Sequence, residues 1–312
     1  MGTVAMRALG RMRRGAKRAG DAVIGALAIG LLTILRLGDP DRMTDFAGRI
    51  MRTIGPLRSE HRLGRANLTA AFPEKSATDI DTILSGVWDN LGRMGAEFAY
   101  LDRLWDFDPA QPGRRGRIEI GPADVERFLD MANDGKPALV FAAHLGNWEL
   151  PGIVAAKYGL DSAVLYRRPN IGGIDRWLAD TRAISMGELI STGLGAPVKI
   201  ADALRRGAHV GMLVDQFYTR GVEVTFFGRR TMANPLLARL AQHFDCPIRG
   251  TRVIRLPGNR FRPELTDAIA PVRDAKGDVD IAATMQVITG VIEGWIREYP
   301  EQWLWVHRRW RT

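Results

Sequence analysis

A histidine and a glutamate stand where they can activate a hydroxyl group. His144 follows an apolar run typical of a buried strand, residues 137–143, and Glu149 comes five residues later. A neutral imidazole accepts a proton near pH 7, and a carboxylate on its second nitrogen fixes the tautomer and stabilises the imidazolium. We therefore interpret His144 as a general base and Glu149 as the acid that orients it. A purely structural pair is the alternative, because this spacing also arises by chance.

A second apolar run also ends in a carboxylate. Residues 210–214 are strand-like and Asp215 follows them. Open α/β sheets bind their ligands at the carboxyl ends of the strands. We expect Asp215 to emerge at the same edge as His144, so that both side chains line one cleft.

Strand-like and helix-like segments alternate from residue 117 onward, which predicts an α/β fold with a mainly parallel central sheet flanked by helices. Asn147 is expected to cap one of these helices. Further upstream, Ser76 and Asp79 have the spacing of a capping box at the start of a long helix. The expected strands are 117–120, 137–143, 162–167, 188–191, 209–214, 249–256 and 260–265, and the expected helices are 122–133, 147–157, 173–186, 199–206 and 279–299.

Four ordered motifs resemble the late acyltransferases of lipid A biosynthesis, the lauroyl/myristoyl acyltransferase family. They lie at 144–149, 166–170, 213–228 and 300–309, and the similarity covers roughly residues 60–310. It implies a fold like that of glycerolipid acyltransferases. It also implies transfer of a fatty acyl group from acyl carrier protein to a hydroxyl of a lipid A precursor, at the cytoplasmic face of the inner membrane.

The resemblance also assigns Arg168 and Asp215 to the active site. A guanidinium there would clamp a phosphate or carboxylate, and Asp215 would hold it in place; an ordinary Arg–Asp pair is the alternative. We expect Phe226–Phe227–Gly228 to wall an acyl tunnel, although core packing explains these residues equally well. Backbone N–H groups at the start of the 147–157 helix and Arg168 are candidates for stabilising the oxyanion. The predicted substrate-binding residues are Asn147, Arg167, Arg168, Asp215, Gln216, Phe226, Phe227 and Gly228.

The excess positive charge lies at the amino terminus. The formal net charge is +9, of which residues 1–65 carry +8. Nucleic-acid binding is disfavoured because no binding signature with interleaved aromatic residues follows, so an anionic membrane surface is the expected partner. Residues 22–35 are apolar, but as a helix they would be only about 21 Å long, which is short for a span. We expect a monotopic or shallow anchor; a cleaved signal and a core helix are the alternatives.

No cofactor or metal site is apparent in the sequence. Cys246 is the only cysteine, which excludes an internal disulfide, and we expect a buried, inert thiol there. The other four histidines lack metal-ligand spacing, and no glycine-rich phosphate loop follows a strand. A cofactor-independent reaction is expected.

Together these observations predict three parts and one leading function. The parts are a basic arm and anchoring helix at 1–40, a helical segment at 41–115 and an α/β acyltransferase core at 116–312. One alternative is a glycolipid or lysophospholipid acyltransferase that uses acyl-coenzyme A, and another is a non-catalytic membrane-surface binding protein. Acyl length, acceptor position and oligomeric state do not follow from the sequence.

Overall fold

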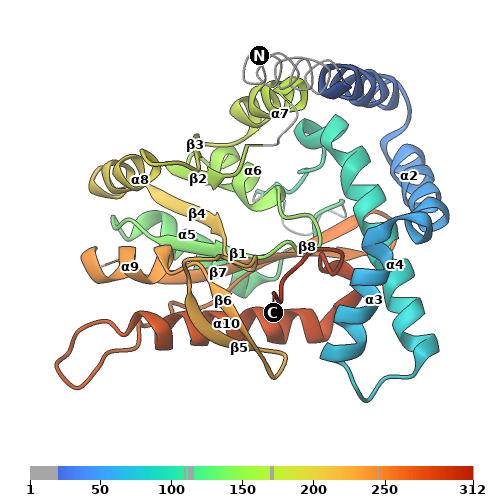
Figure 1. The fold of residues 1–312 in the computed structure, drawn as a ribbon. Coiled ribbons are helices and arrows are strands. Elements are labelled where there is room, and N and C mark those ends of the chain that lie inside the picture. Colours follow the sequence, from blue (N-terminus) through green and yellow to red (C-terminus); the bar gives the residue numbers. More distant parts are fainter. Residues whose placement is uncertain (1–19, 109, 112–115, 169–171, 245, 312) are drawn as a thin grey trace, which may run out of the picture.

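A six-stranded sheet forms the centre of the molecule (Figure 1), in the strand order β3-β2-β4-β1-β7-β8. The computed structural model describes residues 20–108, 110–111, 116–168, 172–244 and 246–311. All neighbouring strands are parallel except β8, which pairs antiparallel with β7. The predicted mainly parallel sheet is therefore confirmed. The strands are β1 (Leu139–Ala142), β2 (Ser162–Tyr166), β3 (Glu188–Ser191), β4 (His209–Leu213), β7 (Ile248–Leu256) and β8 (Arg260–Leu265).

The two faces of the sheet are covered differently. Leu139, Phe141, Ala163 and Val210 point to one face and are fully buried in the main hydrophobic core. Among the helices that contribute to this core are α8 (Ala196–Arg205), α9 (Leu236–His243) and α10 (Ile281–Glu298). The opposite face is less tightly filled, and α5 (Pro122–Asn133), α6 (Leu150–Lys157) and α7 (Gly172–Ser185) lie on that side.

A layer of helices precedes the sheet in the chain and stands along one side of it (Figure 1). It consists of α2 (Pro40–Ile54), α3 (Ser59–Ala71) and α4 (Ala77–Glu97), with 3₁₀ turns η1 (Gly55–Leu57) and η2 (Phe98–Arg103). The capping box predicted for α4 is confirmed. Ser76 Oγ accepts a hydrogen bond from the Asp79 N–H, and Asp79 accepts one from the Ser76 N–H.

A small hairpin and the carboxyl-terminal segment complete the fold. Strands β5 (Val222–Phe226) and β6 (Arg229–Ala233) form a separate antiparallel pair, which the sequence does not predict. After the turn η3 (Pro300–Gln302), the terminal segment returns to the sheet and pairs at Trp303 with Leu145.

Residues 20–35 are helical. None of the helices in the described ranges combines the length and the apolar character needed to cross a membrane. The basic positions predicted to contact lipid within 1–19 lie outside the described residues.

Candidate functional site

His144 and Asp215 form a hydrogen-bonded pair at the carboxyl edge of the sheet. Each lies two residues beyond the end of its strand, and the two strands, β1 and β4, are parallel neighbours. His144 Nδ1 lies 2.8 Å from Asp215 Oδ1, and the backbone N–H of His144 donates to Asp215 Oδ2 at 2.9 Å. The prediction that both side chains emerge at one edge is confirmed.

Asp215 is buried but ionised. Burial by itself would raise its pKa, but the positive charge and hydrogen bond of His144, with a further contribution from His307, hold the pKa well below its usual range. The indole N–H of Trp303 donates a third hydrogen bond to the carboxylate at 2.7 Å. With Nδ1 engaged, the second ring nitrogen of His144 is Nε2, which lies 3.4 Å from Gln216 Nε2, a side-chain amide that can donate a hydrogen bond to it.

Glu149 does not take the role predicted for it. Its carboxylate forms a two-point ion pair with Arg182 of α7, with N···O distances of 2.8 and 2.6 Å. The carboxylate that binds His144 Nδ1 is that of Asp215 and not that of Glu149. The physical reason is the chain direction after β1: α6 begins only at Leu150, and the turn before it directs Glu149 toward α7.

Asn147 is a structural residue of the same turn. Its side chain is fully buried; Nδ2 donates to Glu97 Oε2 at 2.7 Å, and Oδ1 accepts from the Glu149 N–H at 3.1 Å. The sequence predicts Asn147 to bind substrate, but its side chain does not line the cavity described below, and its hydrogen bonds fix the turn between His144 and Glu149. The adjacent Gly146 has a φ of 60°, and a Cβ atom there would lie 1.8 Å from the Val253 carbonyl oxygen. Only glycine fits that position.

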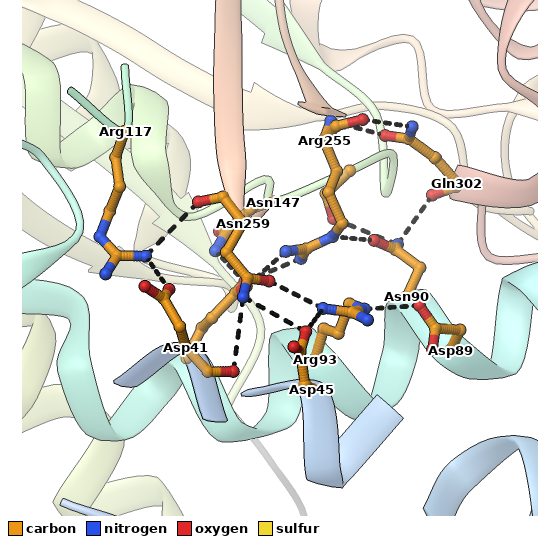
Figure 2. Close-up of polar contacts among 12 residues, drawn as sticks. Asp41, Asp45, Asp89, Asn90, Arg93, Arg117, Asn147, Arg255, Asn259 and Gln302 are labelled. Atoms are coloured by element: carbon orange, nitrogen blue, oxygen red, sulfur yellow. Dashed lines mark hydrogen bonds and ion pairs between the residues drawn. The ribbon is translucent and has the colours of Figure 1, made fainter. Parts of the chain in front are cut away.

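A polar network behind this turn ties it to the helical layer (Figure 2). Arg255 of β7 pairs with Glu97, the residue that holds Asn147, and its Nε donates to Asn90 Oδ1 at 2.9 Å. Asn90 Nδ2 in turn donates to the Gln302 carbonyl at 3.1 Å. The Gln302 carbonyl also accepts from the Gly146 N–H at 3.0 Å. The terminal segment and α4 together therefore hold the 144–149 turn in place.

Arg167 and Arg168 lie exposed at the rim of the site, immediately after β2. The predicted pair between Arg168 and Asp215 does not form, because His144 and Trp303 hold the Asp215 carboxylate. Pro169 and Asn170, which complete this motif, lie outside the described residues.

Phe226 and Phe227 are core residues and do not wall the cavity. They are 1% and 4% exposed and pack against Trp303, Trp305 and Trp310. Phe227 and Gly228 have φ values of 51° and 67° and form the two-residue turn between β5 and β6. The core-packing alternative therefore applies to the two phenylalanines, whereas Gly228 is an exposed turn residue.

A cavity of about 970 Å³ lies beside His144, on the less tightly filled face of the sheet. Alternate strand residues form one wall, because successive side chains point to opposite faces. They are Val140, Ala142, Ser162, Val164, His209 and Gly211. Apolar residues of the covering helices form the other wall, among them Val125, Phe128, Leu129, Met131, Val154 and Ala155.

The cavity runs along the strands and is polar at both ends. His144, Gln216 and the Glu149–Arg182 pair line it at the carboxyl edge, and Ser162 and His209 line it at the amino edge. The five residue steps from Val214 to His209 correspond to about 17 Å. Ser162 Oγ is buried and makes no hydrogen bond to the described residues. Among those residues, no group of three or more histidine, cysteine or carboxylate side chains is arranged to hold a metal ion.

Sequence reasoning missed several residues of this site. Arg182 gives no signal in the sequence, because it is one of two arginines in a helix whose charged positions look like a solvated face. Trp303 lies in the terminal motif, but its bond to Asp215 depends on the return of the chain to the sheet. Gly211 and Ser162 would be found only by assigning which strand positions face α5.

Sequence comparisons identify the family to which this site belongs. The model of the bacterial lipid A biosynthesis acyltransferases matches residues 17–312. Two relatives are each 26% identical over 265 residues, covering 82% of this chain and 80% of the relative. They are the lipid A biosynthesis palmitoleoyltransferase of Escherichia coli (strain K12) and a lipid A biosynthesis acyltransferase of Shigella flexneri. The family match includes β1, β4 and the terminal segment, which build the His144–Asp215 pair. The chain therefore belongs to the bacterial lipid A biosynthesis acyltransferases.

Proposed function

We propose that the protein transfers a fatty acyl group from the thioester of acyl carrier protein to a hydroxyl group of a lipid A precursor. The observation that carries this proposal is the position of the His144–Asp215 pair at one end of a largely apolar cavity. Acyl transfer needs both parts, because the hydrocarbon chain needs an apolar site and the acceptor hydroxyl needs a base. Membership of the family supports the same reaction.

His144 Nε2 is the general base in this proposal. The acceptor hydroxyl gives its proton to Nε2 while its oxygen attacks the thioester carbonyl carbon. The tetrahedral intermediate then collapses, the C–S bond breaks, and Nε2 returns the proton to the departing thiolate. Asp215 accepts a hydrogen bond from Nδ1–H in both steps and stabilises the imidazolium between them.

The side-chain amide of Gln216 is the proposed oxyanion donor. It is partly exposed in the cavity and lies 3.4 Å from His144 Nε2, next to the position of the reacting carbonyl. The helix-start N–H of Glu149 is already engaged, because it donates to Asn147 Oδ1. The exposed guanidinium groups of Arg168 and Arg167 are proposed to bind the phosphates of the acceptor.

The Glu149–Arg182 pair has a positioning role in this proposal. Both side chains line the cavity; that of Glu149 is 6% exposed and that of Arg182 is 13% exposed. The guanidinium of Arg182 also lies over the rings of Phe98 and Tyr166, each at 5.8 Å. The pair thus fastens α7 to the turn before α6 at the polar end of the cavity.

We also propose that the enzyme works at the cytoplasmic face of the inner membrane, with residues 1–40 as its amino-terminal anchor. Exposed apolar side chains at Leu27, Leu31 and Ile34 support a contact with lipid. The net charge of +8 over residues 1–65 supports an anionic surface.

Purified protein tests the reaction directly. It should acylate a lipid A precursor from acyl carrier protein, and His144→Ala should abolish most turnover while the variant still folds and gives a cooperative melting curve. Full activity of His144→Ala would remove the proposed base. Efficient transfer from acyl-coenzyme A to lysophospholipid, with none to the lipid A precursor, would favour the alternative acyltransferase. Equal behaviour of wild type and His144→Ala in every lipid assay would favour the binding protein.

A further inference from the structure

Helix α2 exposes an apolar ridge to solvent. Phe46, Ile50 and Ile54 follow one another at four-residue spacing and are 53%, 40% and 43% exposed, and Leu57 of the following turn is 83% exposed. Residues at this spacing lie on one face of a helix. Exposed apolar patches on soluble proteins mark sites that contact a protein partner or a membrane.

The ridge belongs to a concentration of exposed apolar side chains in one part of the chain. Of the 15 large hydrophobic side chains that are exposed among the described residues, ten lie between 23 and 57. The other six of these ten are Val23, Ile24, Leu27, Leu31, Ile34 and Leu37. The α2 ridge thus follows the proposed anchor directly in the chain but lies outside it.

The exposed arginines of α2 indicate an anionic partner. Arg42 and Arg49 are exposed and lie one helical turn on either side of Phe46. The two acidic residues of the helix are already paired with arginines of the core: Asp41 pairs with Arg117, and Asp45 pairs with Arg93 at 2.5 Å (Figure 2). An apolar ridge edged with exposed arginines, on a helix whose carboxylates are neutralised by such pairs, fits a bilayer with anionic headgroups.

Helix α2 is also fixed firmly to the core. Arg93 of α4 bonds to Asp45 and to Asn259 Oδ1 in the turn between β7 and β8, the latter at 2.7 Å (Figure 2). Asn259 Nδ2 also donates to the Asp41 carbonyl at 3.4 Å. A contact made by such a helix fixes the direction in which the rest of the molecule faces, which a flexible tether does not do.

We propose that the Phe46–Ile50–Ile54–Leu57 ridge of α2 docks on an anionic lipid bilayer and orients the protein on it. This inference goes beyond the anchor at 1–40 and does not depend on acyl transfer. The apolar side chains enter the boundary between headgroups and acyl chains, and Arg42 and Arg49 meet lipid phosphates.

Vesicle partitioning of the full chain measures the contribution of the ridge. The probe is vesicles of phosphatidylcholine with and without phosphatidylglycerol. The variant Phe46→Gln/Ile50→Gln/Ile54→Gln should bind phosphatidylglycerol vesicles at least tenfold more weakly than wild type. The matched control Leu194→Gln/Val198→Gln/Val287→Gln removes three exposed apolar side chains elsewhere and should bind like wild type. Equal binding by the two triple variants would overturn the proposal.

A local probe separates the ridge from the amino-terminal helix. Ile50→Cys, labelled with an environment-sensitive fluorophore, should shift its emission to the blue when phosphatidylglycerol vesicles are added. The same label at Val198→Cys should not shift, and Cys246 is buried in both proteins. A label at position 50 that stays in water while the protein is vesicle-bound would show that the ridge does not dock. This measurement changes one exposed residue and does not require the triple variant to fold.

Discussion

The carboxylate of Asp215 is held by three donors, and their arrangement determines the tautomer of His144. Oδ1 faces Nδ1 of the imidazole, while Oδ2 accepts from the His144 backbone N–H and the Trp303 indole. A fully ionised carboxylate at Nδ1 requires the proton to be there, which leaves the lone pair at Nε2. The group that binds Nδ1 therefore decides whether Nε2 can act as a base.

Replacing Asp215 with asparagine should expose this role. The amide keeps the shape, but it can donate a hydrogen bond to Nδ1 and so favour the tautomer that has no base at Nε2. We expect kcat/KM to fall by about 10²- to 10⁴-fold, the range that proton transfer contributes. Steady-state kinetics and a melting curve measure the change. Asp161→Asn, which removes an exposed carboxylate, is the control, and unchanged kinetics in Asp215→Asn would refute the assignment.

The contacts of Glu149 predict with which residue it is energetically coupled. The two-point ion pair with Arg182 makes Glu149→Gln and Arg182→Lys partly redundant, because either one breaks the same planar contact. In double-mutant cycles on kcat/KM, the coupling of Glu149 to Arg182 should exceed its coupling to His144. The opposite order would restore Glu149 as the partner of His144.

Hydrophobic periodicity predicts most of the regular elements, although the expected strand 117–120 forms only an isolated bridge at Ile118. The bounds of α5 and β3 are predicted to the residue, because proline, glycine and charged residues limit their apolar patterns. The β5–β6 hairpin is missed for a physical reason. Its turn is Phe227–Gly228, with a phenylalanine at positive φ, a conformation that bulky residues seldom adopt. Of the two turn residues, only Gly228 has a type that favours this conformation, and a single glycine does not locate a hairpin.

The site was predictable only in part for a similar reason. The rule that ligands bind at strand carboxyl ends places His144 and Asp215 correctly. It does not determine which carboxylate the imidazole meets, because that depends on the turn before α6 and on the return of Trp303 to the sheet. The cavity depends on which face of strands β1, β2, β4, β7 and β8 is loosely covered, and this requires the helix positions in three dimensions.

Gly211 provides space in the middle of the cavity wall. It is a strand residue without positive φ, and a Cβ atom there would meet nothing nearer than Val164 Cγ2 at 4.0 Å. Gly211→Val should therefore fold, and its side chain should block the cavity about halfway along its length. We expect the ratio of kcat/KM for short over long acyl donors to rise at least tenfold. Gly290→Ala, on the exposed side of α10, is the control. An equal loss for all donors would show that the chain binds elsewhere.

His307, in the terminal segment, makes the stability of the fold depend on pH. Burial lowers the pKa of this imidazole, despite the opposing influence of Asp215. The unfolded chain therefore takes up a proton as the pH falls through about 6.5, before the folded protein does. The contribution of His307 to the free energy of unfolding is therefore complete above this pH and is lost as the pH falls below it. The lowered pKa of Asp215 acts only near pH 4 and below, so it does not obscure the effect.

Melting temperatures at pH 7.5 and 5.5 measure this contribution. His307→Gln removes the titrating group while keeping a side-chain donor, and it should reduce the decrease in melting temperature between the two values. His243→Gln, at the partly exposed end of α9, is the matched control and should keep the wild-type slope. An unchanged slope in His307→Gln would show that another group causes the dependence.

At the scale of the whole molecule, the positive charge is arranged around two proposed contacts. Residues 1–65 carry +8 and include the arginines that edge the α2 ridge. The remaining chain is nearly neutral, but Arg167 and Arg168 stand exposed at the cavity rim. On the β5–β6 hairpin, the guanidinium of Arg229 lies over the Trp310 ring at 4.6 Å, which makes it less available to an acidic partner. The rim arginines, proposed above to bind the acceptor phosphates, are therefore also the proposed contact for an acidic donor.

This placement predicts how donor use depends on salt. An acidic carrier protein presents many charges to the rim, and salt screens such an attraction over a Debye length of about 10 Å at 0.1 M. The apparent KM for the carrier-bound donor should rise more steeply with salt than the KM for the coenzyme A donor of the same chain length. Arg167→Gln/Arg168→Gln should flatten the rise for the carrier-bound donor. Arg230→Gln, which neutralises a side chain that is 83% exposed on the separate hairpin, should leave it unchanged. Equal salt slopes for both donors in the wild type would argue against a carrier protein as the donor, whatever the acceptor.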